Sequence, residues 1–244
     1  MHTQIPPVIT VILHGTLNDF LPARRREQPQ DFPCPPGEEP AIKHVLECLG
    51  VPHVEIATVH VDGRAAPLSE QVGPGRRVDA YPYQSSPWPP RNGVPRFVLD
   101  NHLGKLASYL RILGFDTLYR NDFQDPELAR LAATGRILLT RDRQLLMRNA
   151  VQYGYWMRSK SPRQQLQDTI RYFGLSNCIT PFRRCPRCNA LLEHAEKREI
   201  LEHLEPLTRR YYDDFHRCPS CGQIYWQGSH YQRIAQWVET LQRP

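Results

Sequence analysis

The stretch that decides the fold runs from residue 97 to residue 116 and reads FVLDNHLGKLASYLRILGFD. Its first three residues form a short apolar strand, which ends at Asp100. Leucine and alanine then recur at the spacing of one helix face, and Gly114 closes the helix. The next strand is predicted to start at Asp116. Strand, helix and strand in this order predict an α/β domain with a parallel sheet.

The same alternation continues toward the C-terminus. Further strands are predicted at residues 136–139 and 151–157. One helix is predicted to start at Asp125, with Asp125 as N-cap and Pro126 in the first turn, and to end at Gly135. Another opens at Ser161-Pro162 and stops at Gly174. Helices that alternate with strands flank a parallel sheet, so residues 96–177 are predicted to form one α/β domain.

On the N-terminal side a different pattern precedes a proline-rich segment. Prolines cluster with serine, asparagine and glycine at residues 84–95, a composition that favours an extended linker. Before it, β-branched runs predict strands at 8–13, 56–61 and 77–81, and the apolar spacing at 41–49 predicts one helix. Residues 20–40 are polar and proline-rich, and predict a loop. Residues 1–83 are therefore expected to form a small α+β domain.

The overall composition narrows the class of protein. Lys and Arg number 31 against 25 Asp and Glu, a net charge of +6, which favours a polyanionic partner such as nucleic acid but also fits an ordinary soluble surface. The sequence contains no run of about 18 apolar residues, so no membrane-spanning helix is predicted. The first residues lack the features of a signal peptide. A cytoplasmic location is therefore expected.

Several carboxylates are predicted to lie at one edge of the parallel sheet. Asp100 and Asp142 each follow a strand, and Asp125 and Glu127 begin a helix on the same edge. Gathered carboxylates repel one another unless a cation neutralises them, and Mg²⁺ or Mn²⁺ prefers oxygen ligands. Such a metal can activate water and stabilise charge on a phosphoryl group. The pattern predicts a metal site of this kind.

Structural explanations compete with this interpretation. Asp125 is accounted for as a helix cap, and Asp142 can cap the helix that follows it. Asp100 is less easily explained, because it lies between an apolar strand and an apolar-faced helix. Thr140 can orient a carboxylate or contact the metal shell through its hydroxyl, and Lys105, one helical turn beyond Asp100, can meet a phosphate.

Two Cys-x-x-Cys pairs are the most specific local signal in the chain. Between them lie 29 residues, and their four thiolates can hold one tetrahedral Zn²⁺ in a closed site of a structural kind: Cys185, Cys188, Cys218 and Cys221. A redox motif does not explain a matched pair. Cys34, Cys48 and Cys178 have no matching partners and are interpreted as free thiols.

The cysteine-rich region is also basic and aromatic. Its aromatic residues can stack on nucleic-acid bases or complete a small core, and for most of them the core is favoured. The residues concerned are Arg183, Arg184, Arg187, Lys197, Arg198, Arg209, Arg210, Tyr211, Tyr212, Tyr225, Trp226 and Tyr231.

Together these motifs resemble the Mut7-C ribonuclease domain family. The resemblance rests on residues 97–116, on RILLTRD at 136–142, and on RCPRCN at 184–189 with YWQGSH at 225–230. It implies a PIN-like fold, a zinc ribbon, and acidic residues that bind Mg²⁺ or Mn²⁺ for cleavage of RNA. By motif position Asp100 and Asp142 match the family's acids, and Asp125 or Glu127 matches a further one.

Basic residues within these motifs are the candidates for substrate binding: Lys105, Arg111 and Arg141. One position departs from the family pattern. Gln144 stands where related sequences often carry an acid, and a neutral ligand there would lower metal affinity or activity.

The N-terminal region, about residues 5–83, resembles the ubiquitin-like β-grasp domain found ahead of Mut7-C domains. That domain is similar to sulfur-carrier proteins, which use a free C-terminal Gly-Gly. Here the chain continues through Tyr81-Pro82-Tyr83, so carrier chemistry is excluded and docking of a protein or RNA partner is implied.

The sequence thus predicts a β-grasp domain at 1–83, a linker at 84–95, a PIN-like nuclease domain at 96–177, a zinc ribbon at 178–232 and a C-terminal helix or tail at 233–244. The expected function is a metal-dependent ribonuclease. Two other readings stay open: an RNA- or ribosome-binding module with a decayed nuclease site, and a protein-interaction adaptor acting through the β-grasp domain.

Overall fold

The computed structural model describes residues 7–88, 93–228, 232, 236–237 and 240. The chain divides into two compact units, which are interleaved in sequence. The first comprises Met1–Pro87 with Asp125–Trp156, and the second comprises Trp88–Gln124 with Met157–Pro244.

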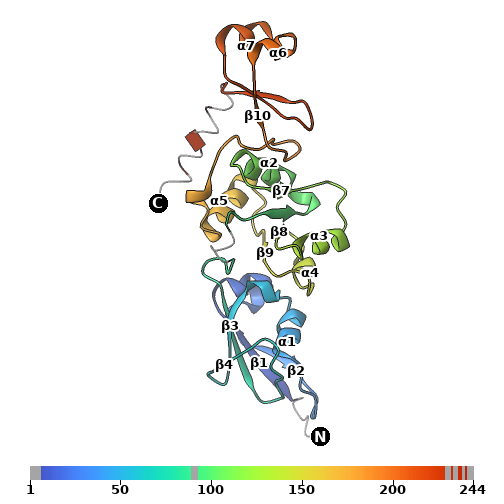
Figure 1. The fold of residues 1–244 in the computed structure, drawn as a ribbon. Helices are drawn as coiled ribbons and strands as arrows, with labels where there is room; N and C mark the ends of the chain where they lie inside the picture. The colour runs from blue at the N-terminus through green and yellow to red at the C-terminus, as the bar shows by residue number, and fades with distance from the viewer. Residues whose placement is uncertain (1–6, 89–92, 229–231, 233–235, 238–239, 241–244) are drawn as a thin grey trace. The chain divides into compact units, whose positions relative to one another are not determined.

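The first unit contains a five-stranded mixed sheet in the order β2-β1-β5-β3-β4 (Figure 1). Its strands are β1 (Val8–Leu13), β2 (Gln30–Pro33), β3 (Ile56–Val61), β4 (Arg64–Ala66) and β5 (Arg77–Pro82). Strands β1 and β5 run parallel, whereas β1–β2, β3–β4 and β3–β5 are antiparallel. The α+β prediction for this region is confirmed.

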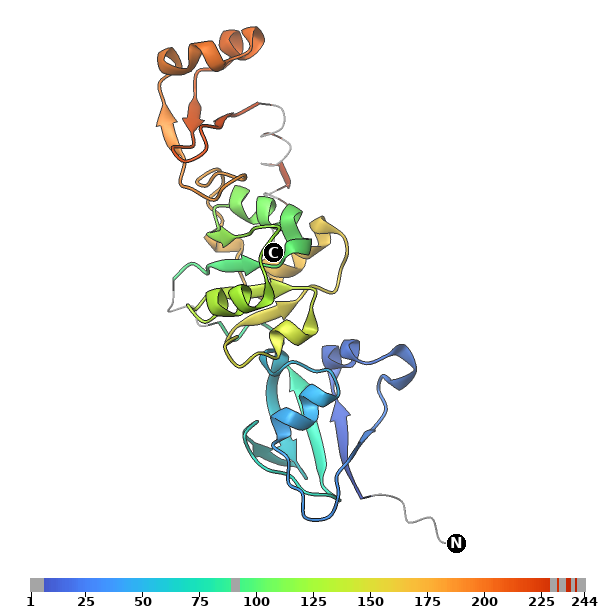
Figure 2. The same cartoon turned by 90° about the vertical axis from the view of Figure 1, so that its right-hand side faces the viewer.

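Helix α1 (Ile42–Cys48) covers one face of this sheet (Figure 2). Alternate residues of β1 are buried, as expected for a strand with one face against a core. Ile42, Val45 and Leu46 of α1 join Ile9 and Val11 of β1 in that core. The buried face of the strand, with its period of two, and the apolar face of the helix, with its period of 3.6, thus pack together in one apolar layer.

Residues 15–33, which include much of the predicted loop at 20–40, contain structure that the sequence did not indicate. Two short 3-10 helices, Gly15–Phe20 and Ala23–Arg25, precede the edge strand β2. Strand β2 reads QDFP and lacks β-branched residues, and its pairing with β1 therefore comes from the backbone rather than from local preference. The short strand β4, which reads RAA and has no β-branched residue, was missed for a similar reason.

The remaining part of the first unit comprises α3 (Asp125–Ala132), β8 (Ile137–Thr140), α4 (Arg143–Leu146) and β9 (Gly154–Trp156). Strands β8 and β9 pair in parallel. The Trp156 ring centre lies 4.9 Å from the Phe20 ring centre. The backbone N–H of Trp156 donates to the Glu55 carboxylate at 2.7 Å. The N-terminal sheet and residues 125–156 therefore pack as one unit, which no local pattern in the sequence indicated.

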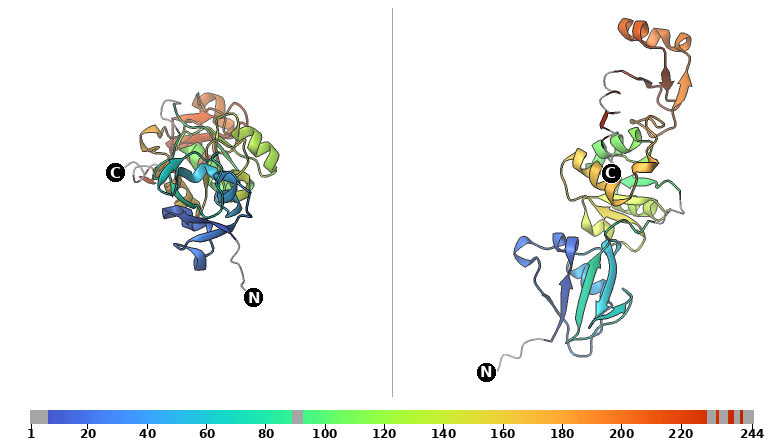
Figure 3. Two further views of the ribbon diagram at one scale, coloured as in Figure 1. Left: turned by 90° about the horizontal axis from the view of Figure 1, so that it is seen from below. Right: turned by 90° about the vertical axis from the view of Figure 1, so that its left-hand side faces the viewer.

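The second unit begins with β6 (Phe97–Leu99), a 3-10 turn (Asn101–Leu103), α2 (Gly104–Ile112) and β7 (Thr117–Leu118). Strands β6 and β7 are parallel, as predicted. Helix α5 (Pro162–Tyr172) lies beside α2 (Figure 3). Gly114 ends the α2 segment with φ +94°, and a side chain there would collide with the Thr180 carbonyl.

The cysteine-rich region forms an antiparallel sheet in the order β10-β11-β12, with strands Glu193–Ala195, Phe215–Arg217 and Ile224–Trp226. Helices α6 (Lys197–Ile200) and α7 (Pro206–Tyr211) and a 3-10 turn (Leu201–His203) lie between β10 and β11 in the chain. Ala195, Ile200, Leu204 and Phe215 form its small core, against which Tyr212 and Ile224 pack.

The aromatic residues of this region divide between core and surface. Tyr212 belongs to the core as predicted, but Tyr211 is 66% exposed and Trp226 is 37% exposed. Tyr231 and most of the predicted C-terminal helix or tail lie outside the described residues. Among the described helices, none combines the length and apolar character that crossing a bilayer requires.

Candidate functional site

Asp100 lies directly after β6 and is only 5% exposed. Its carboxylate accepts a hydrogen bond from the His102 N–H at 2.9 Å and caps the 3-10 turn that leads into α2. The cap accounts for an acid at this point of the chain and fixes the direction of its side chain. Capping and metal binding are compatible, because a carboxylate has several acceptor positions.

Thr140 and Asp142 are brought together at the end of β8. The Thr140 hydroxyl is fully buried and accepts a hydrogen bond from the Asp142 N–H at 2.9 Å. The exposed Asp142 carboxylate accepts from the Gln144 N–H at 2.8 Å and is the N-cap of α4. Thr140 thus orients the backbone of Asp142.

Asp125 and Glu127 both lie in the first turn of α3. The helix begins at Asp125 itself, so Asp125 is its first residue and not the predicted N-cap. The exposed Asp125 carboxylate is 3.7 Å from the guanidinium of Arg148, and Glu127 is half-buried. Asp125, Glu127, Thr140 and Asp142 belong to the first unit, and Asp100 belongs to the second.

The loop that carries Asp142 is braced by the N-terminal sheet of the same unit. Arg143 donates to the Phe20 carbonyl at 2.7 Å, and its guanidinium lies 5.5 Å from the centre of the Trp156 ring. The Trp156 indole N–H in turn donates to the Arg141 carbonyl at 3.2 Å. Sequence reasoning missed Arg143 and Trp156, because neither residue belongs to a local motif that indicates such a contact.

The basic candidates have different environments. Lys105 on α2 and Arg141 after β8 are exposed. Arg111 is only 4% exposed, and its guanidinium donates to the carbonyls of Thr117 at 3.0 Å, Pro186 at 3.1 Å and Arg187 at 2.9 Å. The side chain therefore joins α2 to the first cysteine pair, and its predicted role in substrate binding stays a prediction.

The four paired cysteines form a compact cluster. Their sulfur atoms all lie within 4.8 Å of one another, with 3.6 Å between Cys185 and Cys221 and 3.3 Å between Cys188 and Cys218. Zn–S bonds of about 2.3 Å place the sulfurs of a tetrahedral site about 3.8 Å apart. The cluster therefore fits a structural zinc ion with no open position.

The surroundings of the cluster affect thiol ionisation unevenly. Burial raises the pKa of Cys218 to about 12, whereas hydrogen bonds from the Ala190 N–H and from neighbouring thiols outweigh burial and lower the pKa of Cys188 to about 7. A bound metal would ionise all four sulfurs. No disulfide involves Cys34, Cys48 or Cys178, as expected of free thiols.

Asn189 ties the first cysteine pair to the α/β core of the second unit. Its side-chain amide donates to Asp116 at 2.9 Å, and its side-chain oxygen accepts from the Thr117 N–H at 3.0 Å. Its φ of +74° lies in the left-handed region that asparagine tolerates. With Arg111, it fixes this cysteine pair against α2 and β7.

The chain matches two models of known protein families. A family model described as the Mut7-C RNAse domain matches residues 95–238, more than half of the chain. The chain belongs to the Mut7-C family. A second model, the Mut7-C ubiquitin domain, matches residues 6–87. No curated protein and no solved structure matches the chain.

The two matches confirm the resemblance and its order along the chain. The Mut7-C ubiquitin match covers the five-stranded sheet and α1. The Mut7-C RNAse match covers every candidate acid and all four cysteines of the cluster, and it indicates a nuclease family.

Proposed function

We propose that this Mut7-C protein is a metal-dependent ribonuclease that cleaves RNA phosphodiester bonds. The match to the Mut7-C RNAse domain carries the proposal. It is supported by the position of two acids at carboxyl ends of parallel strands, where ligands of such sheets bind: Asp100 after β6 and Asp142 after β8. The proposed domain is PIN-like, and a cytoplasmic location and an RNA substrate go with it.

In the proposed site, Asp100 and Asp142, with Asp125 or Glu127, hold Mg²⁺ or Mn²⁺. The ion supplies an activated water and neutralises charge on the phosphate. The chain contributes pre-set carboxylates: Asp100 is fixed by the His102 N–H, and Asp142 by the Gln144 N–H and by Thr140. Lys105 and Arg141 are the proposed phosphate contacts. The four-cysteine cluster holds one Zn²⁺ and acts structurally.

The N-terminal domain has a different proposed role. Its last strand β5 continues into the chain at Pro82, so it offers no free C-terminus for carrier chemistry. We assign it the docking of a protein or RNA partner, in addition to the bracing of the Asp142 loop.

Cleavage of labelled single-stranded and structured RNAs tests the function, with EDTA, Mg²⁺ or Mn²⁺, in the parent protein and in Asp100→Asn and Asp142→Asn. Asparagine is as good a cap as aspartate, so each change removes the charge and keeps the turn. Asp31→Asn and Asp213→Asn are matched controls in the two units, because both acids are exposed. We expect metal-dependent cleavage that both site variants lose, at least about 100-fold, and both controls retain.

A second function is favoured by one residue. Gln144 follows Asp142 at a position where an acid would complete a stronger metal site, and its side chain is exposed. RNA binding without cleavage in any metal would select an RNA-binding module with a decayed site. In that case Gln144→Glu is expected to raise metal affinity, measured by titration with Mn²⁺.

A further inference from the structure

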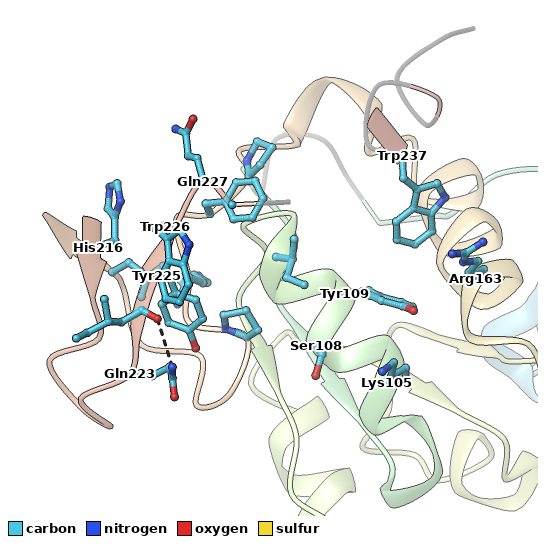
Figure 4. Close-up of a pocket in the computed structure, with 18 residues that line it drawn as sticks. Lys105, Ser108, Tyr109, Arg163, His216, Gln223, Tyr225, Trp226, Gln227 and Trp237 are labelled. Atoms are coloured by element: carbon cyan, nitrogen blue, oxygen red, sulfur yellow. Dashed lines mark hydrogen bonds between the residues drawn. The ribbon is translucent and has the colours of Figure 1, made fainter. Parts of the chain in front are cut away.

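A pocket of about 800 Å³ lies on the second unit between α2 and the cysteine-rich sheet (Figure 4). One face of α2 forms its floor through Lys105, Ser108, Tyr109 and Ile112, which follow the spacing of a helical stripe. Tyr225 and Trp226 of β12 lie on one side of that helix, and Arg163 and Trp237 lie on the other. None of the candidate acids lines this pocket.

The walls of the pocket are held at a fixed separation. Arg111 of α2 binds the Pro186 and Arg187 carbonyls, and the Phe182 N–H donates to the Ile112 carbonyl at 2.8 Å. Phe182 itself lines the pocket with φ +60°, a conformation that costs energy for a bulky side chain. The space is therefore a formed feature of the unit and not a loose gap.

The charges of the residues that line the pocket indicate which kind of ligand it binds. Among the described residues that line the pocket none is acidic, whereas Lys105, Arg163 and Arg184 are basic. Lys105 and Arg163 have no carboxylate partner in the described part of the chain, and the buried Nε of Arg184 has no acceptor there. His216 also lines the pocket, and its Nδ1 lies 3.9 Å from the Asp214 carboxylate.

Aromatic rings lie on both sides of α2, and Arg163 lies beside one of them. The Arg163 guanidinium lies 5.9 Å from the centre of the Trp237 ring, and Tyr109 meets the same ring edge-on at 5.1 Å. On the other side the partly exposed Trp226 stands beside Tyr225. Exposed rings and cations without a carboxylate partner in one pocket suit a single strand, in which bases are free to stack and phosphates carry negative charge.

We propose that this pocket, the α2–ribbon pocket, binds single-stranded RNA through base stacking on Trp226 and Trp237 and phosphate contacts with Lys105 and Arg163. The choice of RNA over another polyanion rests on the proposed function. The pocket extends that function, because it makes a single strand the substrate class and gives the cysteine-rich sheet a part in holding it.

Fluorescence anisotropy with a labelled oligouridylate of about 12 nucleotides tests the proposal, a length within the range that single-strand sites cover. The full-length Asp100→Asn/Asp142→Asn protein is the host, so that the strand is not cut during the measurement. Into it are introduced Trp226→Ala and Arg163→Ala. The controls Tyr211→Ala and Arg210→Ala remove another exposed ring and its cation, 5.6 Å apart on α7 and outside the pocket.

We expect Trp226→Ala to raise the Kd about five- to 100-fold, the effect of one lost stacking partner. Arg163→Ala is expected to weaken binding and to reduce the slope of log K against log salt by about 0.7. The controls are expected to change the Kd by no more than about twofold. Zinc content and urea unfolding establish that each variant is folded, and Trp226→Phe, which keeps a ring, is expected to retain most of the affinity.

Three outcomes overturn the proposal: unchanged binding in folded Trp226→Ala and Arg163→Ala, equal losses in the controls, or equally tight binding of a base-paired hairpin. Competition by uridine monophosphate as strong as that of the oligomer would also overturn it and leave a mononucleotide site. The cleavage assay of the parent protein tests the nuclease function independently of binding in the pocket. Pocket-dependent binding without cleavage rejects only the nuclease, and cleavage without pocket-dependent binding rejects only the pocket.

Discussion

At the residue scale, backbone groups hold two buried ionic side chains of the second unit. Asp100 accepts from the His102 N–H, and Arg111 donates to three backbone carbonyls. Burial lowers the pKa of the Arg111 guanidinium, but so strong a base stays charged at neutral pH. A buried charge is costly unless its hydrogen bonds are made, so each side chain depends on the local backbone geometry.

Replacement of Arg111 by methionine is expected to lower the free energy of unfolding by about 2–4 kcal/mol, because the buried carbonyl of Thr117 and the carbonyls of Pro186 and Arg187 lose their donor. Arg111→Lys restores one contact and is expected to be intermediate. Urea denaturation measures both. The matched change at the exposed Arg130, Arg130→Met, should shift the midpoint little, and an equal shift there would contradict the structural role of Arg111.

A second residue-scale prediction concerns acid stability. The hydrogen bond from Arg77, helped by His14 and opposed by burial, holds the pKa of Asp79 below its usual range. The unfolded chain therefore takes up this proton more readily than the folded protein. The stabilisation is complete above the unfolded pKa of about 3.9 and is lost as pH falls through the lower folded value. Urea unfolding midpoints, measured from about pH 5 to about pH 2, should fall less steeply with falling pH in Asp79→Asn than in the parent or in Asp31→Asn.

At the scale of elements, β9 and the 3-10 turn His53–Glu55 join two stretches of the first unit that are far apart in sequence. Glu55 is only 3% exposed and accepts the Trp156 N–H, and the His53 ring is 3.2 Å from the Val151 carbonyl. These contacts lie beside the Arg143 and Trp156 contacts that hold the loop of Asp142. The ubiquitin-like domain is therefore part of the support for a proposed metal ligand.

Glu55→Ala is expected to cost about 1–3 kcal/mol, because it leaves the Trp156 N–H without its acceptor. Glu55→Gln keeps an acceptor oxygen and should cost less. Hydrogen exchange is the direct measurement: the Trp156 amide should exchange faster in Glu55→Ala than in Glu55→Gln. Glu39→Ala, at an exposed position of the same domain, is the control. Unchanged protection of the Trp156 amide in Glu55→Ala would contradict a stabilising role for this hydrogen bond.

At the scale of the whole molecule, the chain interleaves its two units while the four-cysteine cluster lies wholly in the second. Among the described residues, the buried core of the cysteine-rich sheet consists of Ala195, Ile200, Leu204 and Phe215. So small a core requires a metal for stability.

Loss of the metal should therefore unfold the cysteine-rich sheet and leave the first unit intact. Cys218→Ser is expected to lower the zinc content from one ion per chain toward zero. Hydrogen exchange should rise in β10–β12 and at the Thr117 amide, which Asn189 holds, while β1 and β5 stay protected. Cys178→Ser, at a thiol outside the cluster, is the control. Full zinc content with unchanged protection in Cys218→Ser would contradict the predicted ligand set.

The sequence by itself determined the features that are encoded locally. Apolar residues at periods of two and 3.6, glycines after helices and the spacing of the cysteine pairs predicted β1, β3, β6, α1, α2 and the four-sulfur cluster, because each depends on residues close in the chain. The family motifs predicted the Mut7-C match in the same way.

Only the tertiary structure decided the rest. The edge strand β2, the burial of Arg111 against the first cysteine pair, the brace from Phe20 and Glu55 to residues 143–156, and the α2–ribbon pocket all join segments that are distant in sequence. No local period records such a contact, because its free energy comes from backbone pairing and side-chain burial that arise only when the segments meet.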